Sequence, residues 1–228
     1  AQQVLPYGIP LGIVPMGTFN YMARALGIPL DPLQAAQAIM KGRSRAVHVG
    51  RVNQWIYVNN ASIGLYPYLI EQRESINQRF GRFQTVAKVS GFWALLQQHR
   101  NLKLRMRVDG QAEPVISPVI FFGNNQLQLA DLKLSLAACA AQGRLAVIAV
   151  RPLTRWDMLL LMVRMQLGTF EQSPQVEAFC ADEVTITSRQ PSIRVAMDGE
   201  VREVQTPLRF SVDREALQVR VPDDPAPV

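Results

Sequence analysis

The sequence predicts an α+β protein that is mainly an antiparallel β-sandwich with a few helices, preceded by a short α/β segment. Short apolar runs bounded by turn signals dominate from residue 102 onward, which is the pattern of paired strands. Before about residue 45, a strand, a turn and two helices alternate instead. The 228 residues are 48% hydrophobic and 18% charged, so the composition is that of a globular protein.

The α/β segment is expected to contain one strand and two helices. Gly8–Val14 is a short apolar run that predicts a buried strand. A helix is expected over about Asn20–Leu26, because Gly27 offers the left-handed residue that commonly ends a helix. Asp31-Pro32 is a typical helix start, and this second helix is expected to end near Lys41.

The rest of the chain is expected to be strand-rich, with helices inserted at two places. Two helices are expected over Tyr66–Phe80 and Phe83–His99, and a third over Arg155–Leu167. The third has apolar residues at helical spacing and a capping pattern formed by Thr154 and Asp157. The expected strands are Ala46–Val52, Trp55–Asn60, Leu102–Val108, Val115–Phe122, Leu145–Val150, Val184–Thr187, Ile193–Met197, Leu208–Val212 and Leu217–Val221.

The net charge of +6 admits three partner classes: nucleic acid, an anionic lipid surface or a phosphorylated substrate. The basic residues are scattered and no nucleic-acid motif occurs, so we expect no nucleic-acid partner. The longest apolar stretch, Met158–Val163 within Trp156–Met165, is too short to span a bilayer. Cys139 and Cys180 lack metal-ligand spacing and are expected to be buried thiols.

Gly17, Thr18 and Asn20 lie where the first strand ends and the first helix begins. Glycine would let the backbone approach a ligand, and the free amides of a helix start favour phosphate. An ordinary turn capped by Thr18 or Asn20 explains the same residues.

Asp198-Gly199-Glu200 lies between two expected strands. Two carboxylates at this spacing could bind Mg²⁺ or serve as acid and base. A two-residue hairpin turn is the competing interpretation, because Asp-Gly is among the strongest hairpin signals. Asp109-Gly110 carries the same dipeptide without the glutamate and is expected to be only a turn.

Two polar clusters follow apolar strands, and a basic, aromatic stretch lies between them. Asn59–Leu65 and Gly123–Asn125 could line a cleft or could form turns. Arg79–Arg100 could lie on lipid headgroups, or it could be a helix pair packed on the sandwich.

Taken together, these motifs resemble the diacylglycerol kinase/sphingosine kinase-like lipid kinases, in particular their bacterial members. Pro10–Asn20 and Ala23–Pro29 are similar to the family's signature strand, turn and helix. Val58–Leu65, Gly123–Asn125 and Val195–Glu200 follow in the family's order and at its spacing. The resemblance covers essentially the whole chain.

The resemblance implies a function, a domain organisation and a set of site residues. It implies ATP- and Mg²⁺-dependent phosphorylation of a diacylglycerol-like lipid hydroxyl. Gly17, Thr18 and Asn20 would lie at the nucleotide, and Asp198 and Glu200 would be catalytic. Residues 1–45 would be a remnant of the nucleotide-binding domain, 46–222 the lipid-kinase sandwich and 223–228 a flexible tail. We expect a cytoplasmic protein that acts on a lipid substrate and makes peripheral contact with the anionic inner face of the membrane. Whether the protein forms a homodimer is left open.

Three departures from the family pattern qualify these expectations. No GGDGT nucleotide loop occurs, so the chain by itself is expected to be inactive. Tyr21 replaces the aspartate that often follows Asn20. Gln142 stands where many members carry an acid that is a candidate base. The alternative interpretation is therefore a degenerate, non-catalytic kinase that binds lipid or a partner.

Overall fold

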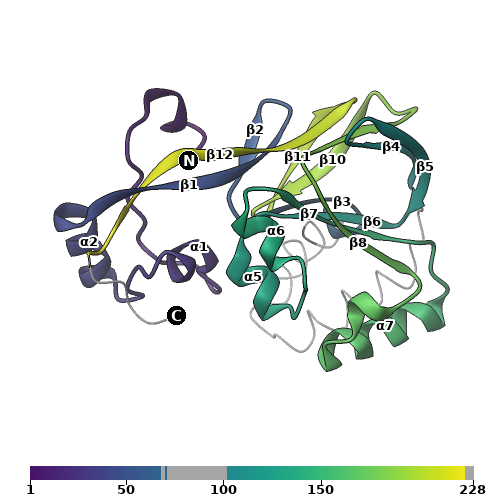
Figure 1. Cartoon of the computed structure of the whole chain (residues 1–228), viewed down its shortest axis with the longest axis horizontal. Coiled ribbons are helices and arrows are strands. Elements are labelled where there is room, and N and C mark those ends of the chain that lie inside the picture. Colours follow the sequence, from purple (N-terminus) through teal and green to yellow (C-terminus); the bar gives the residue numbers. More distant parts are fainter. Residues whose placement is uncertain (68–69, 71–101, 224–228) are drawn as a thin grey trace, which may run out of the picture.

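Two stacked antiparallel sheets with helices against one outer face form most of the molecule (Figure 1). The computed structural model describes residues 1–67, 70 and 102–223. This architecture confirms the predicted sandwich with a preceding α/β segment. The expected helices Tyr66–Phe80 and Phe83–His99, and with them Arg79–Arg100, lie outside the described residues except for residues 66, 67 and 70.

Each sheet has six strands among the described residues, and neighbouring strands within a sheet run antiparallel. The first sheet has the order β2 (Trp55–Tyr57), β1 (Arg43–Val52), β12 (Leu208–Val221), β9 (Glu183–Thr187), β4 (Leu102–Val108), β5 (Gln111–Ser117). The second has the order β11 (Glu200–Gln205), β10 (Ser192–Met197), β3 (Asn60–Gly64), β6 (Val119–Gly123), β7 (Leu145–Val150), β8 (Val176–Ala181).

Within the part of the chain that the structure describes, helices occur in two groups. The α-helices are α1 (Tyr21–Ala25), α2 (Pro32–Lys41), α5 (Gln126–Asp131), α6 (Ala137–Ala141) and α7 (Arg155–Leu167), with short 3₁₀ turns at Leu5–Tyr7 and Phe170–Gln172. The first two belong to the N-terminal segment, and the last three lie on the second sheet (Figure 1). Within the described residues, no helix is long and apolar enough to cross a bilayer.

Strand β7 of the second sheet is buried on both faces. Leu145, Val147 and Ala149 point into the core between the sheets, whereas Ala146 and Ile148 point toward the helices. All six residues of β7 are buried, which explains its continuous apolar sequence. Across the inter-sheet core, the rings of Phe122 and Phe210 stack with centroids 3.7 Å apart.

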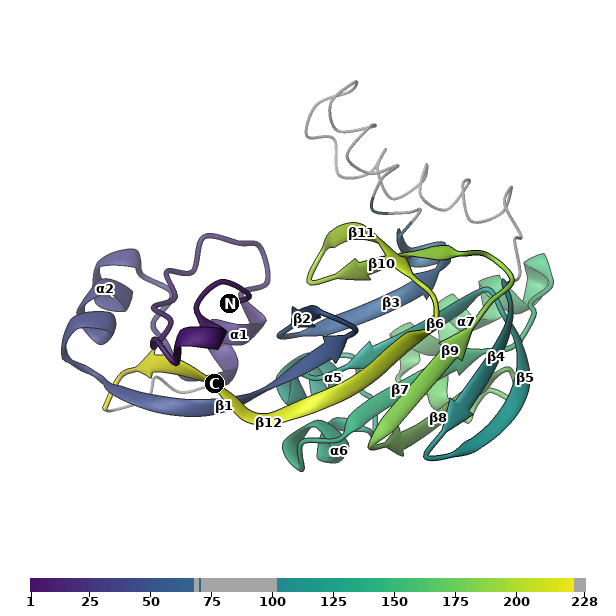
Figure 2. The same cartoon turned by 90° about the horizontal axis from the view of Figure 1, so that it is seen from above.

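A long two-stranded ribbon joins the N-terminal segment to the sandwich (Figure 2). Strand β1 pairs with β12 from Arg43↔Val221 to Val52↔Phe210. One half of the ribbon packs against α1 and α2 through buried residues that include Val49 and Leu217. Since β1 runs without a break through residue 45, the domain division at that position stays a prediction.

The two best-marked helices begin and end as expected. Helix α2 starts at Pro32 with Asp31 as its cap, whose carboxylate accepts the Gln34 N–H at 2.9 Å. Helix α7 starts with a complete capping box, in which the Asp157 carboxylate accepts the Thr154 N–H at 2.8 Å. The hydrogen bonds that the Thr154 N–H and hydroxyl donate to Asp157 lower the pKa of its carboxyl, because they favour the charged form.

Several expected strands were wrong in extent. Gly8–Val14 forms no strand and makes only a bridge between Leu11 and β12, because Pro10 has no N–H to pair. Val115–Phe122 divides at Pro118 into β5 and β6, which lie in different sheets. Leu208–Val212 and Leu217–Val221 are one strand, β12, which continues through a bulge at residues 214–216, opposite His48 of β1. The expected strand Trp55–Asn60 is shorter, since β2 ends at Tyr57, and most of Asn59–Leu65, expected as a turn or cleft rim, is strand β3. Strands β8 and β11 and the short helices α5 and α6 were not predicted.

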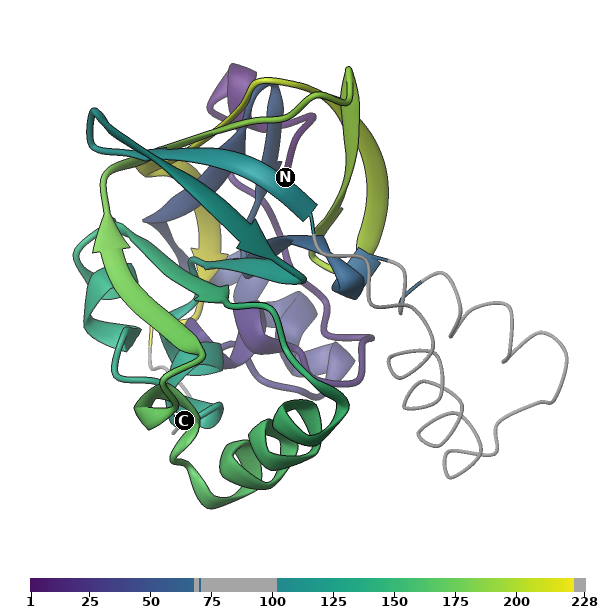
Figure 3. The same cartoon turned by 90° about the vertical axis from the view of Figure 1, so that its right-hand side faces the viewer.

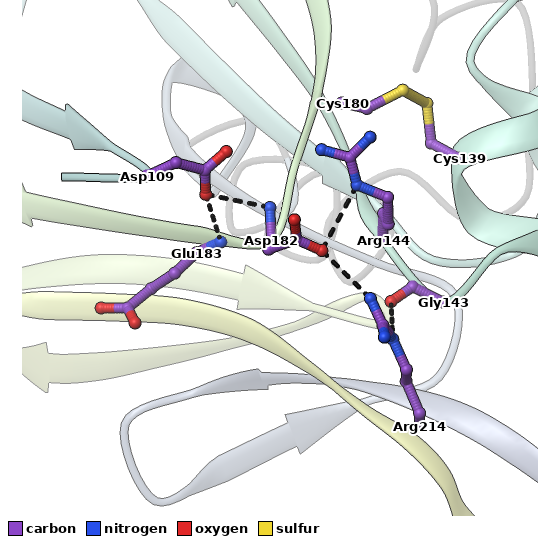
Figure 4. Close-up of polar contacts among 8 residues, drawn as sticks. All are labelled: Asp109, Cys139, Gly143, Arg144, Cys180, Asp182, Glu183 and Arg214. Atoms are coloured by element: carbon purple, nitrogen blue, oxygen red, sulfur yellow. Dashed lines mark hydrogen bonds and ion pairs between the residues drawn. A yellow bond between two sulfur atoms is a disulfide. The ribbon is translucent and has the colours of Figure 1, made fainter. Parts of the chain in front are cut away.

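The two cysteines are not free thiols, contrary to the prediction. Cys139 of α6 and Cys180 of β8 form a disulfide (Figure 4), with Cα atoms 5.7 Å apart. Packing of α6 on the outer face of the second sheet brings the two positions together. Their separation of 41 residues gives no local sequence signal for this contact.

The fold makes a testable prediction about Gly50, which lies opposite Tyr57 in the β1–β2 pair. A Cβ at position 50 would overlap the fully buried Tyr57 ring. Gly50→Ala is therefore expected to lower the free energy of unfolding by about 1–3 kcal/mol, measured by urea titration. Ser44→Ala, at an exposed position of the same strand, is the control, and equal losses in the two variants would contradict this packing.

Candidate functional site

Asp198 and Gly199 form the two-residue turn of the β10–β11 hairpin. Met197 pairs with Glu200, and φ is 49° at Asp198 and 92° at Gly199. Positive φ at both central residues defines the turn type that Asp-Gly favours. The hairpin interpretation of this motif is therefore confirmed, and the function of Asp198 depends on what its side chain contacts.

The Asp198 carboxylate is held by three backbone amides from the connection between β2 and β3. Its oxygens accept the N–H groups of Val58 at 2.7 Å, Asn59 at 2.8 Å and Asn60 at 3.2 Å. The Asp198 N–H in turn donates to the Asn60 carbonyl at 3.0 Å. A carboxylate bonded in this way has a fixed position and orientation.

Four asparagines surround this connection, and we call Asn59, Asn60, Asn124 and Asn125 the asparagine cluster. Asn125 Nδ2 donates to Asn59 Oδ1 at 2.9 Å, and the Asn124 and Asn125 N–H groups both donate to the Asn59 carbonyl. Asn124 Nδ2 donates to the Val58 carbonyl at 3.0 Å. The cluster thus joins the ends of β2, β3 and β6 beside the Asp198 turn.

Helix α5 begins at this cluster. Asn125 is its cap, and Asn125 Oδ1 accepts the Gln128 N–H at 3.0 Å. Gln128 Oε1 accepts a hydrogen bond from Asn60 Nδ2 at 2.9 Å. Gln128, in the first turn of α5, therefore binds two asparagines of the cluster, Asn125 and Asn60.

Burial controls the titration of the two acidic groups at this place. Asp198 is an exposed turn residue, but its carboxylate is turned against the amides of the connection between β2 and β3. Burial of that carboxylate raises its pKa, while the amide donors act in the opposite direction. Burial also raises the pKa of the Tyr57 phenol, and the nearby Asp198 charge raises it further. Tyr57 is therefore a neutral phenol at ordinary pH, and its hydroxyl has no partner among the described residues.

Glu200 does not join Asp198 in the structure. Its carboxylate pairs with Arg202 at 2.9 Å, and the Arg202 guanidinium lies 4.5 Å from the centroid of the Trp55 ring. Glu200 is strongly exposed, so this ion pair contributes little to stability. No cluster of three or more His, Cys, Asp or Glu side chains suited to a metal ion occurs in the described part of the chain.

The turn before α1 is closed by its own asparagine. Asn20 Oδ1 accepts the Gly17 N–H at 2.9 Å, and Asn20 Nδ2 donates to the Gly17 carbonyl at 2.8 Å. Thr18 is exposed at the tip of the turn. Across the described ranges, no hydrogen bond or ion pair joins Gly17, Thr18 or Asn20 to Asp198 or Glu200.

Helix α1 brings the N-terminal segment against the asparagine cluster. Arg24 pairs with Asp131 of α5, with a nitrogen–oxygen distance of 3.1 Å. Between α1 and the sandwich lies a cavity of about 310 Å³. Its lining includes Met22 and Leu26 from α1, His48 from β1, and Asn124 and Asn125 from the cluster.

The loop of Gln142 lies beside two arginines that share one carboxylate. Arg214 Nε donates to the Gly143 carbonyl at 3.1 Å, and Asp182 pairs with both Arg214 and Arg144 (Figure 4). Asp131, the nearest acid before it in sequence, is engaged by Arg24. Within the described chain, this loop therefore presents no free carboxylate.

Two family profiles match the chain, one at each end. The profile of the diacylglycerol kinase catalytic domain matches residues 1–52. The profile of the YegS C-terminal NAD kinase beta sandwich-like domain matches residues 73–221, which is more than half of the chain. The chain belongs to the bacterial diacylglycerol kinase-like family. This finding confirms the resemblance that the sequence motifs suggested.

Individual members of the family match over most of the chain. A diacylglycerol kinase of Staphylococcus carnosus (strain TM300) is 28% identical over 223 residues, covering 94% of this chain and 69% of the relative. One from Staphylococcus aureus (strain Newman) is 27% identical over 215 residues, covering 94% and 67%. A crystal structure of a protein described as a diacylglycerol kinase from Bacillus anthracis str. Sterne superposes with a TM-score of 0.69, at 19% identity over 97% of this chain and 73% of that one.

Some residues of the candidate site follow no motif in the sequence. The asparagines and Asp198 were singled out from the sequence, but Tyr57, Gln128 and the Arg24–Asp131 pair were not. The spacing of Asn125 and Gln128 fits a helix start and could have revealed α5. Tyr57 and the ion pair depend on contacts between distant segments, so no local pattern marks them.

Asp109 offers a matched comparison for the Asp198 turn. Asp109-Gly110 forms the same type of turn, and Asp109 Oδ1 accepts the N–H groups of Asp182 and Glu183 at 3.1 and 3.0 Å. These two donors belong to exposed residues, whereas Asn60 beside Asp198 is buried. Water can therefore replace the Asp109 carboxylate more readily than the Asp198 carboxylate.

We therefore expect Asp198→Ala to lower the free energy of unfolding by about 1–3 kcal/mol, because it leaves partly buried amides without an acceptor. Asp109→Ala should cost less, since water reaches its amides. Urea unfolding of both variants measures the difference. Equal or reversed losses would show that burial does not distinguish the two turns.

Proposed function

We propose that the protein to which this chain belongs transfers the γ-phosphoryl group of ATP to the hydroxyl of a diacylglycerol-like lipid. The oxygen–hydrogen bond of the lipid breaks, a new oxygen–phosphorus bond forms and ADP leaves. The reaction needs a group that accepts the hydroxyl proton. Family membership and the curated relatives named diacylglycerol kinase support this reaction class.

The held carboxylate of Asp198 is the observation that carries this proposal. Three amide donors fix its oxygens, and burial raises its pKa above the ordinary value of 3.8. A raised pKa makes a carboxylate a better proton acceptor, and fixed geometry aligns it with a bound hydroxyl. We therefore assign Asp198 as the general base.

The remaining site residues have supporting roles in the proposal. Gly17, Thr18 and Asn20 would lie at the nucleotide, where the exposed turn that Asn20 closes would face the phosphates. Glu200 would lie at the cleft edge with Arg202, and its carboxylate would act only if that exposed ion pair opened. The GGDGT sequence is absent from these 228 residues, so we propose that the chain alone has no kinase activity.

The described residues do not fit a resident Mg²⁺ site. Glu200 pairs with Arg202 instead of joining Asp198, and no cluster of three acidic or other metal-binding side chains lies there in the described ranges. Magnesium is therefore proposed only as part of the ATP substrate.

A second candidate is a non-catalytic lipid- or partner-binding module. The arginine at the Gly143 carbonyl favours it, because positive charge occupies the loop where many family members carry an acid. The two candidates differ in turnover. A full-length protein without activity toward any diacylglycerol would support the binding module.

Asp198→Asn is expected to reduce turnover by about 10²–10⁴-fold, because an amide cannot accept the proton. The full-length gene product is assayed with MgATP and a short-chain diacylglycerol. Asp109→Asn, which changes the matched turn outside the site, should retain activity. Equal activity of wild type and Asp198→Asn would remove Asp198 from the mechanism.

The pH dependence supplies an independent prediction. A general base works when deprotonated, so kcat/KM should rise with pH through the pKa of Asp198 and be lost as pH falls below it. Since burial raises that pKa, the acidic limb should lie above 3.8. A rate profile that is flat across this range would contradict the assignment.

A further inference from the structure

Helix α7 exposes an apolar face to the outside of the molecule. Trp156 and Leu167, at its two ends, are 79% and 68% exposed. Between them lie further exposed apolar side chains: Leu159, Leu160 and Val163. The spacing i, i+3, i+4, i+7 and i+11 places all five on one face of the helix, which we call the α7 outer face.

Part of the opposite side of α7 packs on the protein, although Met165 on that side is 45% exposed. Leu161 is 6% exposed and belongs to the core between the helices and the second sheet. A helix that is apolar on both sides is normally buried on both. In Figures 1 and 3, α7 lies at the edge of the molecule, and no other described element covers its outer side.

The α7 outer face is held in a fixed orientation. The capping box of Thr154 and Asp157 begins the helix, and Gly168 ends it in the left-handed conformation. Beyond that end, both Glu171 carboxylate oxygens accept the Ser135 N–H at 3.0 Å. The exposed apolar face is therefore a property of an anchored helix.

The charges beside the α7 outer face suit an anionic surface. Arg164 lies on the last turns of the helix, and exposed Lys133 reaches the Gln166 carbonyl at 3.4 Å. Asp157 is negatively charged, but it lies in the first turn of the helix, bonded to the Thr154 N–H and hydroxyl, whereas Arg164 lies in the last turn. A Trp at the boundary, an apolar stripe and basic neighbours are the features of helices that lie in a membrane interface.

We propose that the α7 outer face docks on the surface of an anionic phospholipid bilayer. The helix would lie in the plane of the interface, with Trp156 and the leucines in the acyl boundary and Arg164 and Lys133 at the phosphates. The inference rests on the proposed function in one respect, because a diacylglycerol-like substrate resides in a bilayer. A second copy of the chain is a poorer fit, since a stable dimer buries about 800 Å² per partner and this helix offers five side chains.

Vesicle sedimentation tests the proposal with the 228-residue chain. Vesicles of phosphatidylcholine with phosphatidylglycerol, and of phosphatidylcholine alone, contain no diacylglycerol, so binding does not depend on turnover. The variant Trp156→Glu/Leu167→Glu is compared with Leu33→Glu/Met40→Glu. The control positions lie on α2 and are 76% and 81% exposed.

We expect the α7 variant to reduce partition onto anionic vesicles by about tenfold or more, and the α2 control to leave it unchanged. Wild-type tryptophan fluorescence should shift to the blue on binding, and Trp156→Phe should abolish most of that shift while keeping the binding. Both double variants should melt near the wild-type temperature, because the substituted side chains are exposed.

Three outcomes would overturn the proposal: no binding of folded wild type to anionic vesicles, equal binding by the α7 variant, or a dimer that only the α7 variant dissociates. Kinase assays on dispersed short-chain diacylglycerol separate this inference from the proposed function. Asp198→Asn in the full-length protein should lose turnover and still bind vesicles. The α7 variant in the same protein should keep its turnover of dispersed substrate and lose vesicle binding.

Discussion

The pairing of β1 with β12 is the interaction on which the arrangement of the molecule depends. It joins a strand near the start of the chain to its last strand, in register from Arg43↔Val221 to Val52↔Phe210. One end of the ribbon is buried by α1 and α2, and the other enters the sandwich core. The bulge interrupts the ladder at His48, and there His48 Nδ1 accepts the Glu215 N–H at 3.0 Å. This backbone N–H of the bulge therefore has a hydrogen-bond partner.

The candidate site depends on this pairing. Among the described strands, β2 pairs only with β1, and the connection after β2 supplies the amides that hold Asp198. Helix α1, packed on the same ribbon, reaches α5 through the Arg24–Asp131 pair. The ribbon therefore positions both the catalytic candidate and the segment that carries Gly17, Thr18 and Asn20.

Local sequence predicted well where a few adjacent residues decide the structure. The Asp31 cap, the Thr154–Asp157 capping box and the two Asp-Gly turns each satisfy nearby backbone groups, so their patterns identified them. Prediction failed where long-range pairing decides. Residues 213–215 are polar and resemble a loop, yet β12 runs through them, because β1 pairs with β12 on both sides of the bulge. The apolar spacing of α7 was visible in the sequence, but which side meets solvent was not.

The sequence by itself determined the family, the sandwich class and the identity of the polar residues that meet at the site. Ordered motifs and short apolar runs contain that information, since they depend on neighbours in the chain. Only the tertiary structure distinguished Asp198 from Asp109, because the two turns are locally alike and differ in the burial of the amides they hold. It likewise decided the Cys139–Cys180 disulfide and the exposure of the α7 outer face, as contacts across sheets and layers set both.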